Sequence, residues 1–170
     1  VYKVDNGTAQ SVHADANGGL GAAAAGEAST GVRLIVHLAR VREQSTPPLD
    51  ALLAAAFGAS GWQDFFARAQ LDALRDLDRL LIAGASLRGG PGALAIFESN
   101  LQGDALHDAL DKVVRDSSPE GSGAWLPSAQ PLARASLAGD TRVFGLPNPN
   151  RLVSAALGDR ACVEGFAKES

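Results

Sequence analysis

Two polar residues at the end of a predicted strand are the most site-like feature of the sequence. The apolar run from Ala93 to Phe97 predicts a strand, and Glu98 and Asn100 follow it directly. Strand ends commonly present binding and catalytic groups, because a rigid element positions the residues that come after it. The pair could therefore bind a small ligand or serve an enzyme. The alternative interpretation is a surface pair that terminates the strand.

A run of acidic residues earlier in the chain favours a structural role. Asp72, Asp76 and Asp78 are closely spaced, but they lack the alternating oxygen ligands and the glycine of a calcium loop. Helix capping and pairing with Arg75 and Arg79 account for them better. We therefore predict ion pairs rather than a cation site here.

Neither the histidines nor the single cysteine has the neighbours that metal binding or nucleophilic catalysis requires. His13, His37 and His107 are never four residues apart, which is the spacing of a helical metal pair. Cys162 has no base or cationic cluster nearby in the sequence to activate its thiol. We expect no metal and no cofactor, and we do not expect the chain to be an enzyme.

Composition and charge argue against two classes of partner. The 170 residues include 15 Lys and Arg against 19 Asp and Glu, a net charge of -4, so no basic field exists to hold a nucleic acid. No apolar run approaches the roughly 18 residues of a membrane helix. We therefore expect neither nucleic-acid binding nor a transmembrane segment in this chain.

The first thirty residues differ in composition from the rest of the chain. The run from Asn17 to Gly26 is mostly alanine and glycine, which bury too little apolar surface to offset the entropy of ordering the backbone. We predict that residues 1–30 are an Ala/Gly-rich tether or a partner-binding extension, and that residues 31–170 form a single domain. The start at Val1 and the absence of methionine indicate a processed or truncated piece of a longer product.

The elements that follow predict an α+β fold. Apolar periodicity predicts strands near residues 32–38, 79–83, 93–97, 131–137, 141–146 and 151–157, and helices near 47–58, 60–66, 71–78, 104–115 and 159–167. The strands at 79–83 and 93–97 should form an antiparallel hairpin, and the strand at 131–137 should lie at the sheet edge. This order is a split β-α-β pattern, so we expect a two-layer sandwich with helices on one face of a mainly antiparallel sheet, in ferredoxin-like order.

Particular residues should hold this fold together. Trp62, Phe65, Phe97 and Leu110 should be buried together, because helices on one face must cover the apolar side of the sheet. The hydroxyl of Ser60 should cap the helix that carries Trp62. The terminal helix should bury three apolar residues, Ala161, Cys162 and Phe166.

Three stretches of the chain resemble a group of proteins. They are VRLIVHLARVR at 32–42, GWQDFF at 61–66 and LRDLDRLLIAGASLR at 74–88, and they are similar to sequences of uncharacterised myxobacterial envelope-associated proteins. In that group a soluble α+β domain follows an N-terminal anchor and a low-complexity linker. The similarity covers about residues 31–157. It implies a location in the cell envelope, on the periplasmic side, and it carries over no catalytic residue.

These observations predict a non-catalytic interaction domain of the bacterial cell envelope, acting as an accessory subunit of a larger protein assembly. Protein partners would bind in part through residues 1–30. The alternative is a small-ligand-binding protein or an enzyme with its site near the end of the strand at 93–98, where Glu98 and Asn100 would contact the ligand.

Overall fold

The computed structural model describes residues 2–6, 32–44, 47–59, 61–84, 94–156 and 160–168. Several predictions fall elsewhere. The Ala/Gly-rich run at 17–26, His13, Ser60 and the side chains of Cys162 and Phe166 lie outside the described residues.

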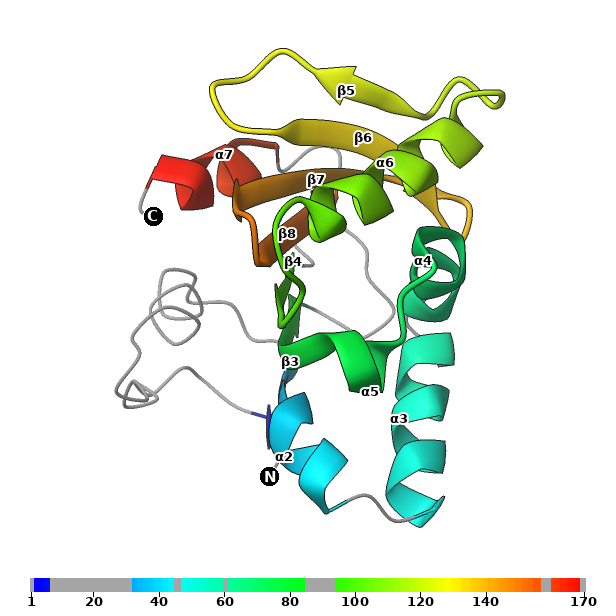
Figure 1. Cartoon of the computed structure of the whole chain (residues 1–170), viewed down its shortest axis with the longest axis vertical. Coiled ribbons are helices and arrows are strands. Elements are labelled where there is room, and N and C mark those ends of the chain that lie inside the picture. Colours follow the sequence, from blue (N-terminus) through cyan, green and yellow to red (C-terminus); the bar gives the residue numbers. More distant parts are fainter. Residues whose placement is uncertain are drawn as a thin grey trace.

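One eight-stranded antiparallel sheet forms the frame of the fold (Figure 1). Its strands follow the order β1-β2-β3-β4-β8-β7-β6-β5, and each is antiparallel to its neighbours. The strands are β1 (Tyr2–Asn6), β2 (Val32–His37), β3 (Leu77–Gly84), β4 (Leu94–Ser99), β5 (Ala124–Leu126), β6 (Leu132–Leu137), β7 (Asp140–Asn148) and β8 (Arg151–Ala156). The predicted mixture of helices with an antiparallel sheet is confirmed, as is the β3-β4 hairpin.

Six helices accompany the sheet in the described part of the chain. They are α2 (Leu38–Glu43), α3 (Pro47–Ala59), α4 (Trp62–Ala69), α5 (Ala73–Asp76), α6 (Ala105–Ser117) and α7 (Arg160–Lys168). The clearest amphipathic pattern, at 104–115, is confirmed by α6, which buries Leu106, Leu110, Val113 and Val114. The strand expected through residue 38 ends at His37, and Leu38 begins the unpredicted helix α2.

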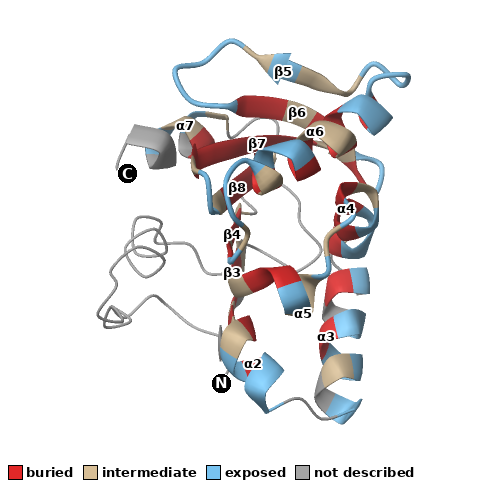
Figure 2. Cartoon of the chain, viewed as in Figure 1, coloured by how far each residue is buried: buried red, intermediate tan, exposed pale blue. Residues whose placement is uncertain are grey.

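An aromatic core lies between the sheet and helices α3, α4 and α6. Figure 2 colours parts of these helices, and much of strands β6 and β7, as buried. The Trp62 ring of α4 lies 4.4 Å from the Phe97 ring of β4, centroid to centroid, and Phe65 stacks on Phe144 of β7 at 5.5 Å. Leu110 of α6 belongs to the same buried cluster. The predicted burial of Trp62, Phe65, Phe97 and Leu110 in one core is therefore confirmed.

The opposite face of the sheet carries a second apolar core and a helix of its own. Val163 of α7 is buried with Leu81, Ile96 and Val153, which belong to β3, β4 and β8. At Gly145 of β7, an added Cβ would lie only 2.5 Å from Val163 Cγ1, so the absence of a side chain there lets α7 approach the strand. The expected sandwich with helices on one face is not confirmed, because α7 packs against β7 and β8 from the other side.

The strand order differs from the expected ferredoxin-like order. In this sheet β1 to β4 and β5 to β8 each lie beside their neighbours in the sequence, and β4 pairs with β8 between the two runs, so the ferredoxin-like order is not confirmed. The strand predicted at 131–137 is β6, but it is not an edge strand, because the short strand β5 pairs along its outer side. Neither feature follows from local periodicity.

The first residues of the chain take part in the sheet. Tyr2–Asn6 forms β1, which pairs with β2 from Tyr2 opposite Val36 to Asn6 opposite Val32. This corrects the expectation that all of residues 1–30 are a tether, because a strand at the sheet edge contributes main-chain hydrogen bonds to the domain.

Two helix termini also differ from prediction. Gly61, rather than Ser60, is the residue that precedes α4, and it makes no side-chain capping bond. Its φ of 77° lies in the left-handed region, and an added Cβ would be 2.8 Å from the Ala138 Cβ, so the position requires glycine. In α7, Ala161 is exposed, contrary to prediction, and Val163 is buried, because the close approach at Gly145 determines which face of the helix meets β7.

Candidate functional site

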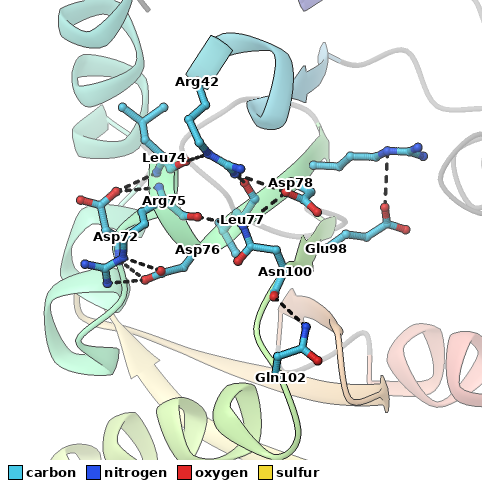
Figure 3. Close-up of polar contacts among 11 residues, drawn as sticks. Arg42, Asp72, Leu74, Arg75, Asp76, Leu77, Asp78, Glu98, Asn100 and Gln102 are labelled. Atoms are coloured by element: carbon cyan, nitrogen blue, oxygen red, sulfur yellow. Dashed lines mark hydrogen bonds and ion pairs between the residues drawn. The ribbon is translucent and has the colours of Figure 1, made fainter.

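Glu98 and Asn100 lie at the same end of the sheet but belong to different polar groups (Figure 3). Glu98 is in β4, and its carboxylate contacts arginines on both neighbouring strands. Asn100 follows β4, and its side-chain amide donates a hydrogen bond to the Arg75 carbonyl oxygen in α5 at 2.9 Å. The two predicted residues are therefore close in the sequence, but their side chains have different partners.

The short helix α5 is held by its own acidic residues. Asp72 is its N-cap, and the Oδ1 atom accepts hydrogen bonds from the backbone N–H groups of Leu74 and Arg75, both at 2.9 Å. Asp76 is buried, and its carboxylate accepts the Arg75 Nε and Nη2 hydrogen bonds at 2.7 and 2.8 Å and the Asp72 backbone N–H at 2.8 Å. The bond from Arg75 holds the pKa of Asp76 below its ordinary value of 3.8, although burial acts in the opposite direction. The predicted capping and the predicted pairing with Arg75 are confirmed.

Arg42 of α2 joins α5 to the beginning of β3. It donates from Nε to the Leu74 carbonyl oxygen and from Nη2 to the Leu77 carbonyl oxygen, both at 2.7 Å, and Nη2 lies 3.2 Å from Asp78 Oδ1. The β3-β4 register shifts just after Leu77, so Asp78 has no residue opposite it, as in a β-bulge that redirects a side chain. The Asn100 amide lies 3.4 Å from the same Asp78 oxygen. These contacts fasten α2, α5 and the end of β4 together.

Glu98 stands between two arginines of adjacent strands. Arg79, Glu98 and Arg151 lie opposite one another on β3, β4 and β8. Arg151 Nη2 donates to Glu98 Oε1 at 2.8 Å, and Arg79 Nε lies 3.6 Å from Glu98 Oε2. The prediction that the acidic run near residue 76 pairs with Arg79 is wrong, because the register of the hairpin places Glu98 opposite this arginine.

This geometry favours ion pairing over acid–base chemistry. A general acid or base must have a carboxylate that is free to contact a substrate. Asp76, Asp78 and Glu98 each have an arginine partner. Across the described ranges, no three histidine, cysteine or acidic side chains gather as a metal ion would require.

A second group, which the sequence analysis did not single out, lies at the far edge of the sheet. Trp125 of β5 donates its indole N–H to Asp111 Oδ1 at 2.9 Å, and the His107 ring stacks on it with centroids 4.7 Å apart and planes 10° apart. Arg115 Nη2 lies 2.6 Å from Asp111 Oδ2. The bond from Trp125 and the charge of Arg115 hold the pKa of Asp111 below its ordinary value of 3.8. Trp125 remains 36% exposed, so a fixed aromatic side chain faces solvent at an edge strand.

The two histidines in the described part of the chain lie in different elements. His37 is half-buried in β2, whereas His107 is exposed on α6 and stacks on Trp125. One sequence signal could have pointed to the second group, because His107 and Asp111 lie four residues apart on the polar face of the predicted helix. The Trp125 partner lies in another element, so the spacing alone does not reveal it.

Comparisons with known proteins add no family. No protein-family model matches the chain, and neither a curated protein nor a solved structure matches it significantly. The resemblance to myxobacterial envelope-associated proteins stays a prediction from the sequence. Among the described helices, none has the length and apolar character needed to cross a bilayer.

Proposed function

We propose that this chain is a non-catalytic protein-interaction domain, an accessory subunit that works on the periplasmic side of the bacterial cell envelope. The observation that carries the proposal is the exposed Trp125 on the edge strand β5, held by Asp111 and His107. Aromatic residues are enriched at protein interfaces and often contribute most of the binding energy. A side chain that is already fixed loses little conformational entropy on binding, which favours a docking role.

The polar groups at the end of β4 support the non-catalytic part of the proposal. Glu98 forms an ion pair with Arg151, and Asp78 forms one with Arg42. Both carboxylates therefore already link two secondary-structure elements. The Asn100 amide is likewise bonded to the main chain of α5. An enzyme centred on Glu98 and Asn100 is therefore less well supported than an interaction domain.

A matched pair of variants tests the docking role. Trp125→Ala removes the exposed aromatic of β5, and Leu52→Ala removes another exposed apolar side chain, which is 50% exposed on α3. When the protein is isolated under mild conditions from the producing cells, the wild type and Leu52→Ala should each carry a near-stoichiometric partner. The amount of partner recovered with Trp125→Ala should be lower by about tenfold or more, as for a strong interface residue. Equal recovery with Trp125→Ala, or a wild type that purifies alone, contradicts the proposal.

The location and the role of the first residues need separate tests. Cell fractionation should find the protein with the envelope, and a purely cytoplasmic distribution contradicts that part of the proposal. Partner binding through residues 1–30 stays a prediction. A variant in which a short Gly/Ser linker replaces residues 7–30 tests it, because it keeps Tyr2–Asn6 and leaves enough chain for Asn6 to pair with Val32.

A further inference from the structure

A row of three charged side chains crosses the sheet on the face opposite the aromatic core. Arg79, Glu98 and Arg151 stand side by side on β3, β4 and β8, and we call them the Arg79–Glu98–Arg151 row. The next residues inward on the same face are apolar and belong to the second core, since side chains two apart along a strand share a face. Each of the three side chains is between 22% and 27% exposed, so a ligand can reach the row from solvent.

The two guanidinium groups have more donors than the row uses. An arginine carries five N–H donors in a planar fork that matches a carboxylate. Arg79 makes an ion pair of 3.6 Å with Glu98 and no hydrogen bond to another described residue. Arg151 donates one hydrogen bond to Glu98, and its Nε is buried without an acceptor among the described residues. Partly desolvated donors that lack acceptors favour the binding of an oxyanion.

The charge of the row indicates which oxyanion fits. Two arginines against one glutamate leave one net positive charge, which a single carboxylate neutralises and a phosphate dianion exceeds. We propose that the Arg79–Glu98–Arg151 row binds a carboxylate, either of a free small acid or of an acidic side chain, through the unused N–H donors of Arg79 and Arg151. Glu98 lies between the two forks and already accepts one hydrogen bond from Arg151. This row is on another part of the sheet than Trp125, so the inference stands or fails independently of the proposed function.

A purely structural interpretation of the row makes a different prediction for one variant. Opposite charges on neighbouring strands stabilise a sheet, and in that case Glu98 would matter only for stability. As part of a carboxylate site, Glu98 competes with the ligand for the arginines and repels it. Glu98→Gln should therefore strengthen carboxylate binding even if it weakens the fold.

Peptide titration followed by the arginine Nε–H signals in ¹H–¹⁵N NMR spectra tests the site directly. The probes are a blocked tripeptide with glutamate between two valines, the same peptide with glutamine, sodium acetate and sodium phosphate. The protein is the full chain as wild type, Arg79→Gln, Arg151→Gln, Glu98→Gln and Arg40→Gln, the last being an exposed arginine of α2 outside the row. Thermal unfolding establishes whether each variant is folded. If Arg79→Gln or Arg151→Gln is not, the lysine variant of the same residue, which keeps the charge and loses the fork, replaces it.

The expected result has four parts. The glutamate peptide shifts the Arg79 and Arg151 signals in a saturable manner, and the glutamine peptide does not. Affinity falls by about tenfold or more in the Arg79 and Arg151 variants, since each loses charge-assisted hydrogen bonds, and it is unchanged in Arg40→Gln. Affinity rises by about fivefold in Glu98→Gln, as a repelling charge a few ångströms away is removed. Acetate binding as tight as the peptide identifies a free small acid as the ligand, and much weaker acetate binding identifies an acidic side chain.

Three results would overturn the inference. They are equal shifts with the glutamate and glutamine peptides, wild-type affinity in both arginine variants, and saturation by phosphate but not by either carboxylate probe. The peptide comparison uses only the wild type, so it decides the matter even if every row variant unfolds.

Discussion

The docking of α7 depends on the missing side chain of Gly145, and a single methyl group tests it. An added Cβ would lie 2.5 Å from Val163 Cγ1, whereas ordinary contacts begin at 3.4 Å, so α7 or the valine must give way by about 0.9 Å. Overpacking of this kind costs about 1 to 3 kcal/mol. Alanine also lowers the conformational entropy of the unfolded chain, which offsets about 0.4 to 1 kcal/mol of this cost. We therefore expect Gly145→Ala to lower the free energy of unfolding by about 1 to 2 kcal/mol.

Removal of the opposing methyl groups should rescue part of that loss. Val163 is 1% exposed, and Val163→Ala alone deletes two buried methyl groups, worth about 1.5 kcal/mol at about 0.8 each. In the double variant the methyl group added at position 145 occupies some of the space that the valine leaves. The combined loss should be smaller than the sum of the single losses by about 1 kcal/mol, within the range usual for residues in contact.

Urea titrations followed by circular dichroism measure these free energies. Gly165→Ala is the matched control, because Gly165 belongs to the same helix and an added Cβ there meets nothing within 4 Å. That variant should gain about 0.5 to 1 kcal/mol from the higher helix propensity of alanine. Strictly additive losses at Gly145 and Val163, or a Gly145→Ala protein as stable as the wild type, would refute the contact between α7 and β7.

Three further predictions concern other parts of the fold. Leu110→Ala should cost about 2 to 5 kcal/mol in a denaturant titration, because Leu110 is fully buried on α6, and a loss below about 0.5 kcal/mol would show that this helix is not packed as described. Asp76 has a folded pKa below its unfolded value of about 3.8, so the stabilisation from its bond to Arg75 is complete above that value and is lost as the pH falls through the folded pKa. The stability difference between the wild type and Asp76→Asn should therefore shrink below pH 3.8, and a constant difference contradicts the assignment. Protonation of Asp111 in the same acidic range should release the Trp125 indole and change its fluorescence, a change that Trp125→Phe should abolish and that is measured by titration from neutral to acidic pH.

Local patterns predict the elements of this fold better than their partners. The alternation in β2 and the helical spacing in α6 are properties of consecutive residues, and the structure confirms both. The capping of α5 by Asp72 is equally local, since the N–H groups that it accepts from lie two and three residues away. Such features depend on backbone geometry within one or two turns of chain, which the residue order specifies directly.

Long-range pairing is what the residue order leaves undetermined. Glu98 and Arg151 are 53 residues apart, and Arg42 and Asp78 are 36 apart, so neither pair is visible before the strands are in register. The three residues of β5 are too few to show a period, and their pairing is set by β6. The bulge that turns Asp78 toward Arg42 likewise arises from the alignment of two strands rather than from either strand alone.

The single junction between β4 and β8 has a consequence for how the chain folds as it is synthesised. The described strands form two runs, β1 to β4 and β5 to β8, and among them only the β4-β8 pair joins the runs. β8 follows β5, β6 and β7 in the sequence, so one edge of β4 stays unpaired during synthesis while α6 and these three strands are made. Contacts between such distant segments slow folding, and an open edge beside an apolar core is prone to pair with other chains. A nascent or truncated chain that ends before Arg151 should therefore aggregate through the free edge of β4. Pairing with β8 covers that edge.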